Sequence, residues 1–95
     1  MHAKSSATRP EQLLPMLLER LTPREWEVLR LILEAQTSKE IAHILNISQR
    51  TAEQHCENLK AKLLARSTMD VLRIVAAAER MGLVSHRQFD VAEHA

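Results

Sequence analysis

The sequence predicts an all-α fold of five helices, and three observations support this prediction. The chain of 95 residues contains one Gly and three Pro, whereas the helix-favouring residues Leu, Ala, Glu, Lys and Arg are frequent. Apolar residues recur at intervals of three and four along several stretches, which is the spacing of one helix face. A Thr or Ser suited to cap a helix precedes each of these stretches.

Composition places the chain among small single-domain proteins. Hydrophobic residues make up 45% of the sequence, enough for a core, and 13 basic against 12 acidic residues give a net charge of +1. The single Cys excludes an internal disulfide and fits a reducing compartment. No apolar run approaches the ~20 residues of a membrane span, and the N-terminus leads into no signal-peptide core. We therefore expect a cytoplasmic protein without a membrane partner.

Residues 1–20 are expected to form an N-terminal tail and a short amphipathic helix. Thr8 and Glu11 have the spacing of a capping box, with a Pro between them. Pro15 lies inside the apolar pattern and should either kink the helix or start a shorter one. The helix either packs on the domain or serves as a contact for a partner. Its apolar positions are Leu14, Leu17, Leu18 and Leu21.

Two further helices are predicted at about 23–34 and 39–45. Thr22 and Glu25 form a second capping box, and Thr37 or Ser38 caps the shorter helix. Trp26 falls at the edge of the buried face, where packing is the more common role. The buried positions of the first of these helices are Val28, Leu29, Ile32 and Leu33.

The stretch from Ser38 to Leu63 has the pattern of a helix-turn-helix. Asn46 tolerates the left-handed backbone that ends a helix, and Ser48 is a good cap for the next one. A second helix, at about 49–64, can enter a DNA groove. Its inward stripe is Ala52, Cys56, Leu59 and Leu63.

A fourth helix of this domain is predicted from Ser67 or Thr68 to about Met81, with Gly82 as its stop. One arc of it carries Val71, Ile74, Val75, Ala78 and Met81, and another carries Met69, Leu72 and Ala76. Two apolar arcs suggest one inward face and one face against a second copy, while a single wide core-facing arc is the alternative. Residues 83–95 are expected to be a tail, with a short helix starting at Ser85 and Gln88 as its box partner.

Several short motifs in this order resemble the LuxR-type (GerE/NarL/FixJ effector) DNA-binding domain. They are Leu21-Thr22-Pro23-Arg24-Glu25, Glu27-Val28-Leu29, Lys39-Glu40-Ile41-Ala42, Leu45, Ile47-Ser48, Thr51, His55, Lys62-Leu63 and Arg66-Ser67. The resemblance implies a four-helix helix-turn-helix domain at 21–82, which makes the fold all-α with an additional N-terminal helix. It also implies a recognition helix at 49–64, a dimerisation surface on the fourth helix and a promoter as partner.

The sequence departs from the family pattern where glycine is common. Those positions hold Ala35, Asn46 and Leu64. Asn46 is a sensible substitute at positive φ, whereas Ala35 and Leu64 cost about 1 kcal/mol each if the left-handed geometry is kept. The change at Leu64 would otherwise let the recognition helix run on toward Arg66.

The resemblance also points to candidate site residues. At these positions the sequence departs from the family pattern a second time, in its charge. The expected base-reading positions include two acids, which repel phosphates but accept a bond from cytosine N4, while Gln54 can read adenine. The base-reading candidates are Glu53, Gln54, Glu57 and Asn58. The phosphate-contact candidates are Lys39, Arg50, Thr51, Lys60 and Arg66. The dimer-interface candidates are Met69, Leu72, Arg73 and Ala76.

The expected function is that of a bacterial sequence-specific DNA-binding transcriptional regulator that acts as a homodimer on double-stranded promoter DNA. The alternative is a protein-interaction module that keeps the fold but has lost DNA binding, which the acidic recognition helix and the near-zero charge motivate. We expect no enzyme activity, no cofactor and no catalytic residues. No metal site is expected either, because no metal-ligand spacing connects His2, His43, His55, His86 and His94.

Overall fold

The computed structural model describes residues 8–89, and within that range the chain forms five α-helices and no strand. The all-α prediction is confirmed. Residues 1–7 and 90–95, which belong to the two expected tails, lie outside the described residues. The helices are α1 (Pro10–Leu18), α2 (Pro23–Leu33), α3 (Ser38–Leu45), α4 (Gln49–Lys62) and α5 (Thr68–Arg80).

Short-range capping explains where most of the helices begin. The Thr22 side chain accepts from the Glu25 backbone N–H at 3.1 Å, and the Glu25 carboxylate accepts from the Thr22 N–H at 2.9 Å. Thr37 and Glu40 form the same reciprocal box at the start of α3. Ser48 and Ser67 cap α4 and α5 by accepting from the backbone N–H three residues ahead. These hydrogen bonds satisfy backbone donors that have no partner inside a helix.

The cap of α1 differs from the expected Thr8–Glu11 box. Arg9 is the N-cap, and its backbone N–H donates to Gln12 Oε1 at 2.9 Å. The shift by one residue follows from Pro10, which occupies the first helical position and lacks an N–H. Pro15 lies within α1 without ending it, although it leaves the Glu11 carbonyl without its usual helical donor.

Four helices end in the same way, with one residue in the left-handed region. The backbone N–H of the residue that follows it donates to the carbonyl five residues earlier, as from Gln36 to Leu31 at 3.0 Å and from Ala65 to Lys60 at 2.8 Å. The chain therefore keeps the left-handed geometry at Leu64, and α4 does not run on toward Arg66. The left-handed residues are Ala35 (φ 67°), Asn46 (φ 57°), Leu64 (φ 60°) and Gly82 (φ 75°).

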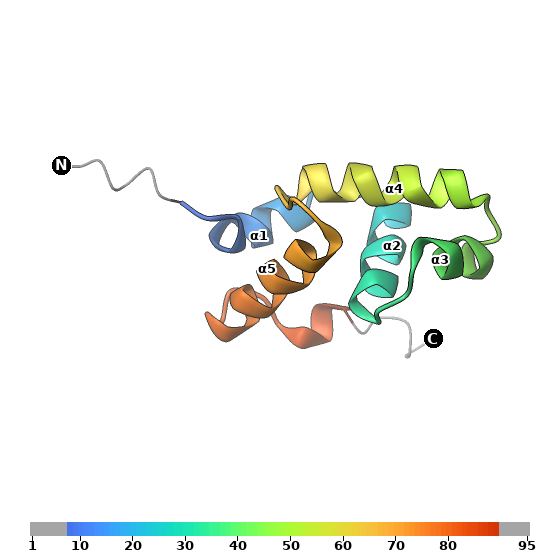
Figure 1. Ribbon diagram of the computed structural model, residues 1–95. Coiled ribbons are helices and arrows are strands. Elements are labelled where there is room, and N and C mark those ends of the chain that lie inside the picture. The colour runs from blue at the N-terminus through green and yellow to red at the C-terminus, as the bar shows by residue number, and fades with distance from the viewer. Residues whose placement is uncertain (1–7, 90–95) are drawn as a thin grey trace.

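The long helix α4 lies along one side of the molecule (Figure 1). Its N-terminal half lies over α3, its middle over α2, and its C-terminal end approaches α1 and α5. The core between them contains the inward stripe of α4, because Ala52, Cys56, Leu59 and Leu63 are 0–8% exposed. Val28, Leu29 and Ile32 of α2 pack into the same core, as do Val71 and Ile74 of α5. The predicted inward face of α4 is thus buried, and so are those of α2 and α5 except at their ends, where Leu33 is only half-buried and Met81, which follows the last residue of α5, is 49% exposed.

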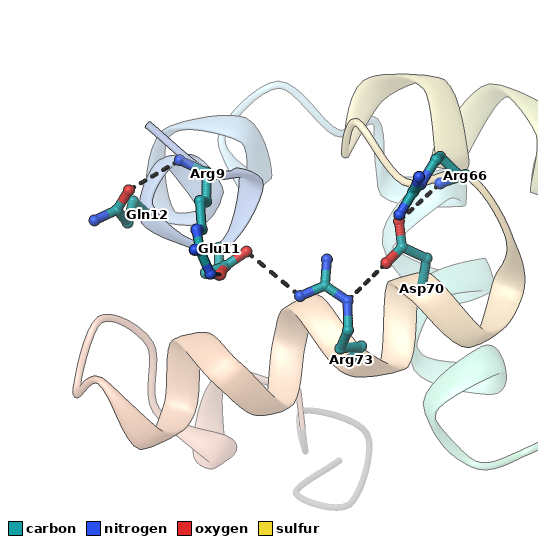
Figure 2. A network of polar contacts seen from close by, with 6 residues as sticks. All are labelled: Arg9, Glu11, Gln12, Arg66, Asp70 and Arg73. Carbon is teal, nitrogen blue, oxygen red and sulfur yellow. Dashed lines mark hydrogen bonds and ion pairs between the residues drawn. The ribbon is translucent and has the colours of Figure 1, made fainter. Parts of the chain in front are cut away.

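The N-terminal helix α1 contributes to this core. Of the two interpretations of this helix, packing on the domain is therefore the one that describes its contacts. Leu14, Leu17 and Leu18 are 0–7% exposed, and α1 packs against α5. Glu11 is also buried and faces Arg73 of α5 (Figure 2). α1 therefore covers one flank of the helix that was expected to form a dimer.

A single 3-10 turn, η2 (His86–Phe89), follows α5 where the short C-terminal helix was expected. The Ser85 backbone N–H donates to Gln88 Oε1 at 2.8 Å, the box partner that the sequence suggested. Phe89 is buried, and its ring centroid lies 5.8 Å from that of Trp26. Trp26 of α2 thus has a packing role, through Phe89 and through the core beside it. No helix within residues 8–89 has both the length and the apolar character that a membrane crossing requires.

Candidate nucleic-acid interface

The turn between α3 and α4 fixes how α4 is presented. Asn46 adopts a left-handed conformation (φ 57°, ψ 50°) that ends α3, and Ile47 packs against the core. Ser48 is extended and caps α4. Ala42, buried at 6% exposure, allows the two helices to approach closely. These contacts hold α4 across α3 in the arrangement of a helix-turn-helix.

The side of α4 opposite its buried stripe is open to solvent. The four base-reading candidates, Glu53, Gln54, Glu57 and Asn58, are all exposed, and Arg50 and Ala61 extend the same surface. We call these six residues the outer face of α4. The structure thus brings the four candidates together on one surface that no described part of the chain covers. Whether they contact bases stays a prediction.

Hydrogen bonds along α4 hold several side chains of its outer face in place. Gln49 Nε2 donates to Glu53 Oε2 at 3.2 Å, and Gln54 Nε2 donates to Asn58 Oδ1 at 3.1 Å. Both pairs are four residues apart, the spacing at which helix side chains meet. Each amide therefore directs one N–H at a neighbouring side chain of the same helix.

The five phosphate-contact candidates differ in how they are held. Lys39 and Arg50 are exposed and make no ion pair with any residue in 8–89. Thr51 is exposed, but its hydroxyl oxygen accepts from the Ser48 hydroxyl at 2.9 Å. Lys60 is only 19% exposed and lies 2.8 Å from the Glu57 carboxylate. Arg66 is 90% exposed and lies beyond α4, with its Nε atom 3.9 Å from Asp70.

A contact that the sequence did not reveal orients the C-terminal end of α4. Lys62 Nζ lies 2.8 Å from Glu25 Oε1 and also donates to the Arg20 carbonyl at 3.3 Å. Burial raises the pKa of Glu25, but the hydrogen bonds from Lys62 and from the Thr22 backbone lower that pKa by more, so it lies below its ordinary value. The carboxylate that caps α2 therefore also anchors α4. The capping box was visible in the sequence, but its second partner was not.

The dimer-interface candidates lie along one side of α5. Met69 is 72% exposed and Arg73 is exposed, whereas Leu72 and Ala76 are half-buried. Arg73 Nε donates to Asp70 Oδ1 at 2.8 Å, and its Nη1 atom lies 3.8 Å from Glu11 Oε1 (Figure 2). The Arg66 backbone N–H and the Arg73 side chain lower the pKa of Asp70 by donating hydrogen bonds to it. Arg73 is thus engaged within the chain on the flank that α1 covers.

Cys56 lies on the inner stripe of α4 and is 8% exposed. Burial raises the pKa of its thiol, although a hydrogen bond with Ser38 opposes this effect. A buried thiol with a raised pKa is a poor nucleophile and acts as a small core residue. Within residues 8–89, no three His, Cys, Asp or Glu side chains gather in a way that could hold a metal ion.

Several known proteins are similar in sequence to the part of the chain that contains the helix-turn-helix. The transcriptional regulatory protein MctR of Rhizobium johnstonii is 47% identical over 53 residues, which are 56% of this chain and 25% of that protein. The uncharacterized response regulatory protein YgeK of Escherichia coli is 41% identical over 63 residues, 66% of this chain and 41% of that protein. The transcriptional regulatory protein FixJ of Rhizobium meliloti is 38% identical over 60 residues, 63% of this chain and 29% of that protein.

The chain therefore spans a quarter to two-fifths of the length of these relatives. No solved structure matches it. The sequence profile of the bacterial regulatory proteins of the luxR family matches residues 19–75, which run from just before α2 into α5 and cover more than half of the chain. The helix α1, at Pro10–Leu18, precedes the matched region. The chain belongs to the luxR family of bacterial regulatory proteins.

Proposed function

We propose that the protein is a sequence-specific DNA-binding transcriptional regulator that acts on promoter DNA in the bacterial cytoplasm. The observation that carries the proposal is the two-sided character of α4. One side is buried from Ala52 to Leu63, and the other presents only polar or small side chains from Arg50 to Ala61. A helix of this kind, preceded by α3 and a tight turn, can be inserted into a major groove.

Membership of the luxR family and similarity to transcriptional regulatory proteins such as FixJ support this function. Lys39 and Arg50 would contact phosphates on either side of the groove, because both are exposed and lack ion pairs among the described residues. Lys60 would contribute less, since Glu57 neutralises it at 2.8 Å. Glu53, Gln54, Glu57 and Asn58 would then discriminate between bases.

The test is a binding titration with duplex DNA from upstream of its own gene, repeated over a range of salt concentrations. Affinity should fall with salt at a log–log slope of about −0.9 per phosphate contact. Arg50→Ala should weaken binding and reduce the slope by about one contact. Arg80→Ala, which removes an exposed cation at the end of α5, should change neither quantity. Absence of binding, or binding that salt does not affect, would contradict the proposal.

The active form in this proposal is a homodimer formed through α5. Met69, Leu72 and Ala76 leave an apolar strip on the flank that α1 does not cover, and Arg73 borders it. Size-exclusion chromatography with light scattering, with and without DNA, should detect the dimer. Met69→Glu should weaken it, whereas Met16→Glu, at an exposed methionine of α1, should not. A monomer on one DNA half-site under all conditions would contradict the dimer.

A second candidate function is that of a protein-interaction module that has lost DNA binding. It is favoured by one observation, the two exposed carboxylates at Glu53 and Glu57 on the surface that would meet DNA. Changing both to Lys should then create strong DNA binding where the native protein has none. Tight binding of promoter DNA by the native protein would remove this candidate.

A further inference from the structure

The middle of the outer face of α4 carries two exposed carboxylates, Glu53 and Glu57. Glu53 uses one carboxylate oxygen to accept from Gln49, and Glu57 uses one to hold Lys60. In each carboxylate the second oxygen has no partner among residues 8–89. Gln54 uses one of its two amide hydrogens on Asn58, which leaves its carbonyl oxygen and its second N–H without a partner among residues 8–89. The middle of the helix therefore offers acceptors from three side chains, Glu53, Gln54 and Glu57, together with N–H donors from Gln54 and Asn58.

Few groups in a DNA major groove can satisfy such a surface. Guanine presents two acceptors and thymine one, so a carboxylate opposite either base would be repelled. Cytosine N4 and adenine N6 are the only hydrogen-bond donors on base edges in that groove. The pairing of Glu57 with Lys60 at 2.8 Å offsets part of its charge, which lowers the cost of bringing this carboxylate close to phosphates.

We infer that α4 reads exocyclic amino groups, so that its half-site holds cytosine or adenine where Glu53, Gln54 and Glu57 meet the bases. This inference rests on the proposed function and specifies its DNA partner. It also implies a form of regulation. Methylation of cytosine N4 or adenine N6 replaces the one amino hydrogen that points into the major groove, because the other hydrogen pairs with the opposite base. Amino-methylated operator DNA would therefore be rejected.

The first experiment selects half-sites from a random duplex pool with the unmodified protein. Cytosine or adenine should be enriched at two or more positions on the contacted strand. Duplexes with N4-methylcytosine or N6-methyladenine at those positions should then bind about tenfold more weakly. The matched control is 5-methylcytosine, which leaves the amino group intact, and its effect should be smaller. Selection of guanine at these positions, or equal effects of N4 and C5 methylation, would overturn the inference.

The second experiment changes the protein. Glu57→Lys replaces an acceptor by a donor and should convert a cytosine preference into a guanine preference at a single position. Glu19→Lys makes the same change of charge at an exposed site after α1 and should leave every base preference unchanged. A uniform rise in affinity with Glu57→Lys, without a changed preference, would show that Glu57 acts only by repulsion and would overturn the inference.

These outcomes separate the inference from the function on which it depends. If the native protein and both variants select no duplex, the proposed function itself fails. If only Glu57→Lys selects DNA, the acceptor surface excludes DNA instead of reading it, and the second candidate function is supported in place of this inference.

Discussion

The Nζ atom of Lys62 lies 2.8 Å from the Oε1 atom of Glu25, and this contact joins the last turn of α4 to the first turn of α2. The side chain of Glu25 is 9% exposed and that of Lys62 is 38% exposed, so solvent reaches the pair mainly from the lysine side. Glu25 Oε1 also accepts from the Thr22 backbone N–H. One carboxylate oxygen thus serves both the cap of α2 and the position of the recognition helix.

Replacement of Lys62 by Met should destabilise the protein by about 1–2 kcal/mol, because Glu25 keeps its charge but loses its counter-ion. Urea unfolding followed by helical circular dichroism measures this change. Replacing Lys60 by Met is the matched control, since its partner Glu57 is 67% exposed and can be hydrated. Equal effects of the two substitutions would show that the buried carboxylate of Glu25 gains nothing specific from Lys62.

The lowered pKa of Glu25 predicts how the stability of the protein depends on pH. The pKa is lower in the folded state than its ordinary value of about 4.3, so the ionised carboxylate stabilises the fold above that pH. This contribution is lost as pH falls through the folded-state pKa, where the carboxylate takes up a proton. Glu25→Gln should therefore unfold more easily at neutral pH and converge with the native protein in acid. Parallel stability curves from about pH 7 to about pH 3 would contradict this account.

Local patterns were sufficient to predict the helices and the buried stripe of α4. Each cap or stripe depends on residues three or four positions apart, and the spacings of Thr22–Glu25 and Ala52–Cys56 are visible in the sequence. The long-range partners were not predictable. Lys62 is 37 positions from Glu25, and nothing in the sequence distinguishes it as a partner from the other Lys and Arg residues of the chain. Glu11 was assigned to a cap, but its carboxylate instead faces Arg73 on another helix.

Part of the candidate interface was also predictable from local patterns in the sequence. The exposure of Glu53, Gln54 and Glu57 followed from helical periodicity. The pairing of Gln54 with Asn58 and of Glu57 with Lys60 is also local, and their spacings of four and three residues could have indicated it. The distribution of charge on the surface depends on such pairs, so a count of acids and bases alone does not describe the charge that DNA would meet.

Ala35 provides a test of backbone strain, because it adopts φ 67° without being glycine. Ala35→Gly should stabilise the protein by about 0.5–1 kcal/mol, since glycine occupies the left-handed region without a Cβ clash. Ala61→Gly removes the same methyl group from an exposed position inside α4 and should destabilise by about 1 kcal/mol. Thermal unfolding of both variants measures the difference. A loss of stability with both substitutions would indicate that Ala35 carries no strain.

The thiol of Cys56 should react slowly in the native protein. It is 8% exposed, and burial raises its pKa, so little thiolate is present near neutral pH. Labelling with a chromogenic disulfide reagent should accelerate by orders of magnitude in a denaturing urea concentration. Cys56→Ala should be tolerated with a cost of about 1 kcal/mol, because the side chain fills a small site on the inner stripe. Labelling of the native protein as fast as that of the unfolded chain would contradict burial.

Arg73 is one of two counter-ions, with Arg9, of a carboxylate that has almost no access to water. Glu11 is 3% exposed, its Oε1 atom accepts no hydrogen bond among the described residues, and Arg73 Nη1 lies 3.8 Å away. Arg73→Met should therefore destabilise the protein by about 1–2 kcal/mol, because it leaves the buried Glu11 carboxylate with a single counter-ion, Arg9, whose side chain is 72% exposed and lies 3.9 Å away. Arg80→Met, at an exposed site on the same helix, should change stability by less than about 0.5 kcal/mol.

Replacing Glu11 as well should reverse the loss caused by Arg73→Met. The double variant Glu11→Met, Arg73→Met removes both charges from the contact between α1 and α5 and should be close to the native protein in stability. Because Arg73 also borders the proposed dimer surface, the unfolding curves should be measured at several protein concentrations. A double variant as unstable as Arg73→Met, at a concentration where all forms are monomeric, would show that Arg73 stabilises the fold through contacts other than Glu11.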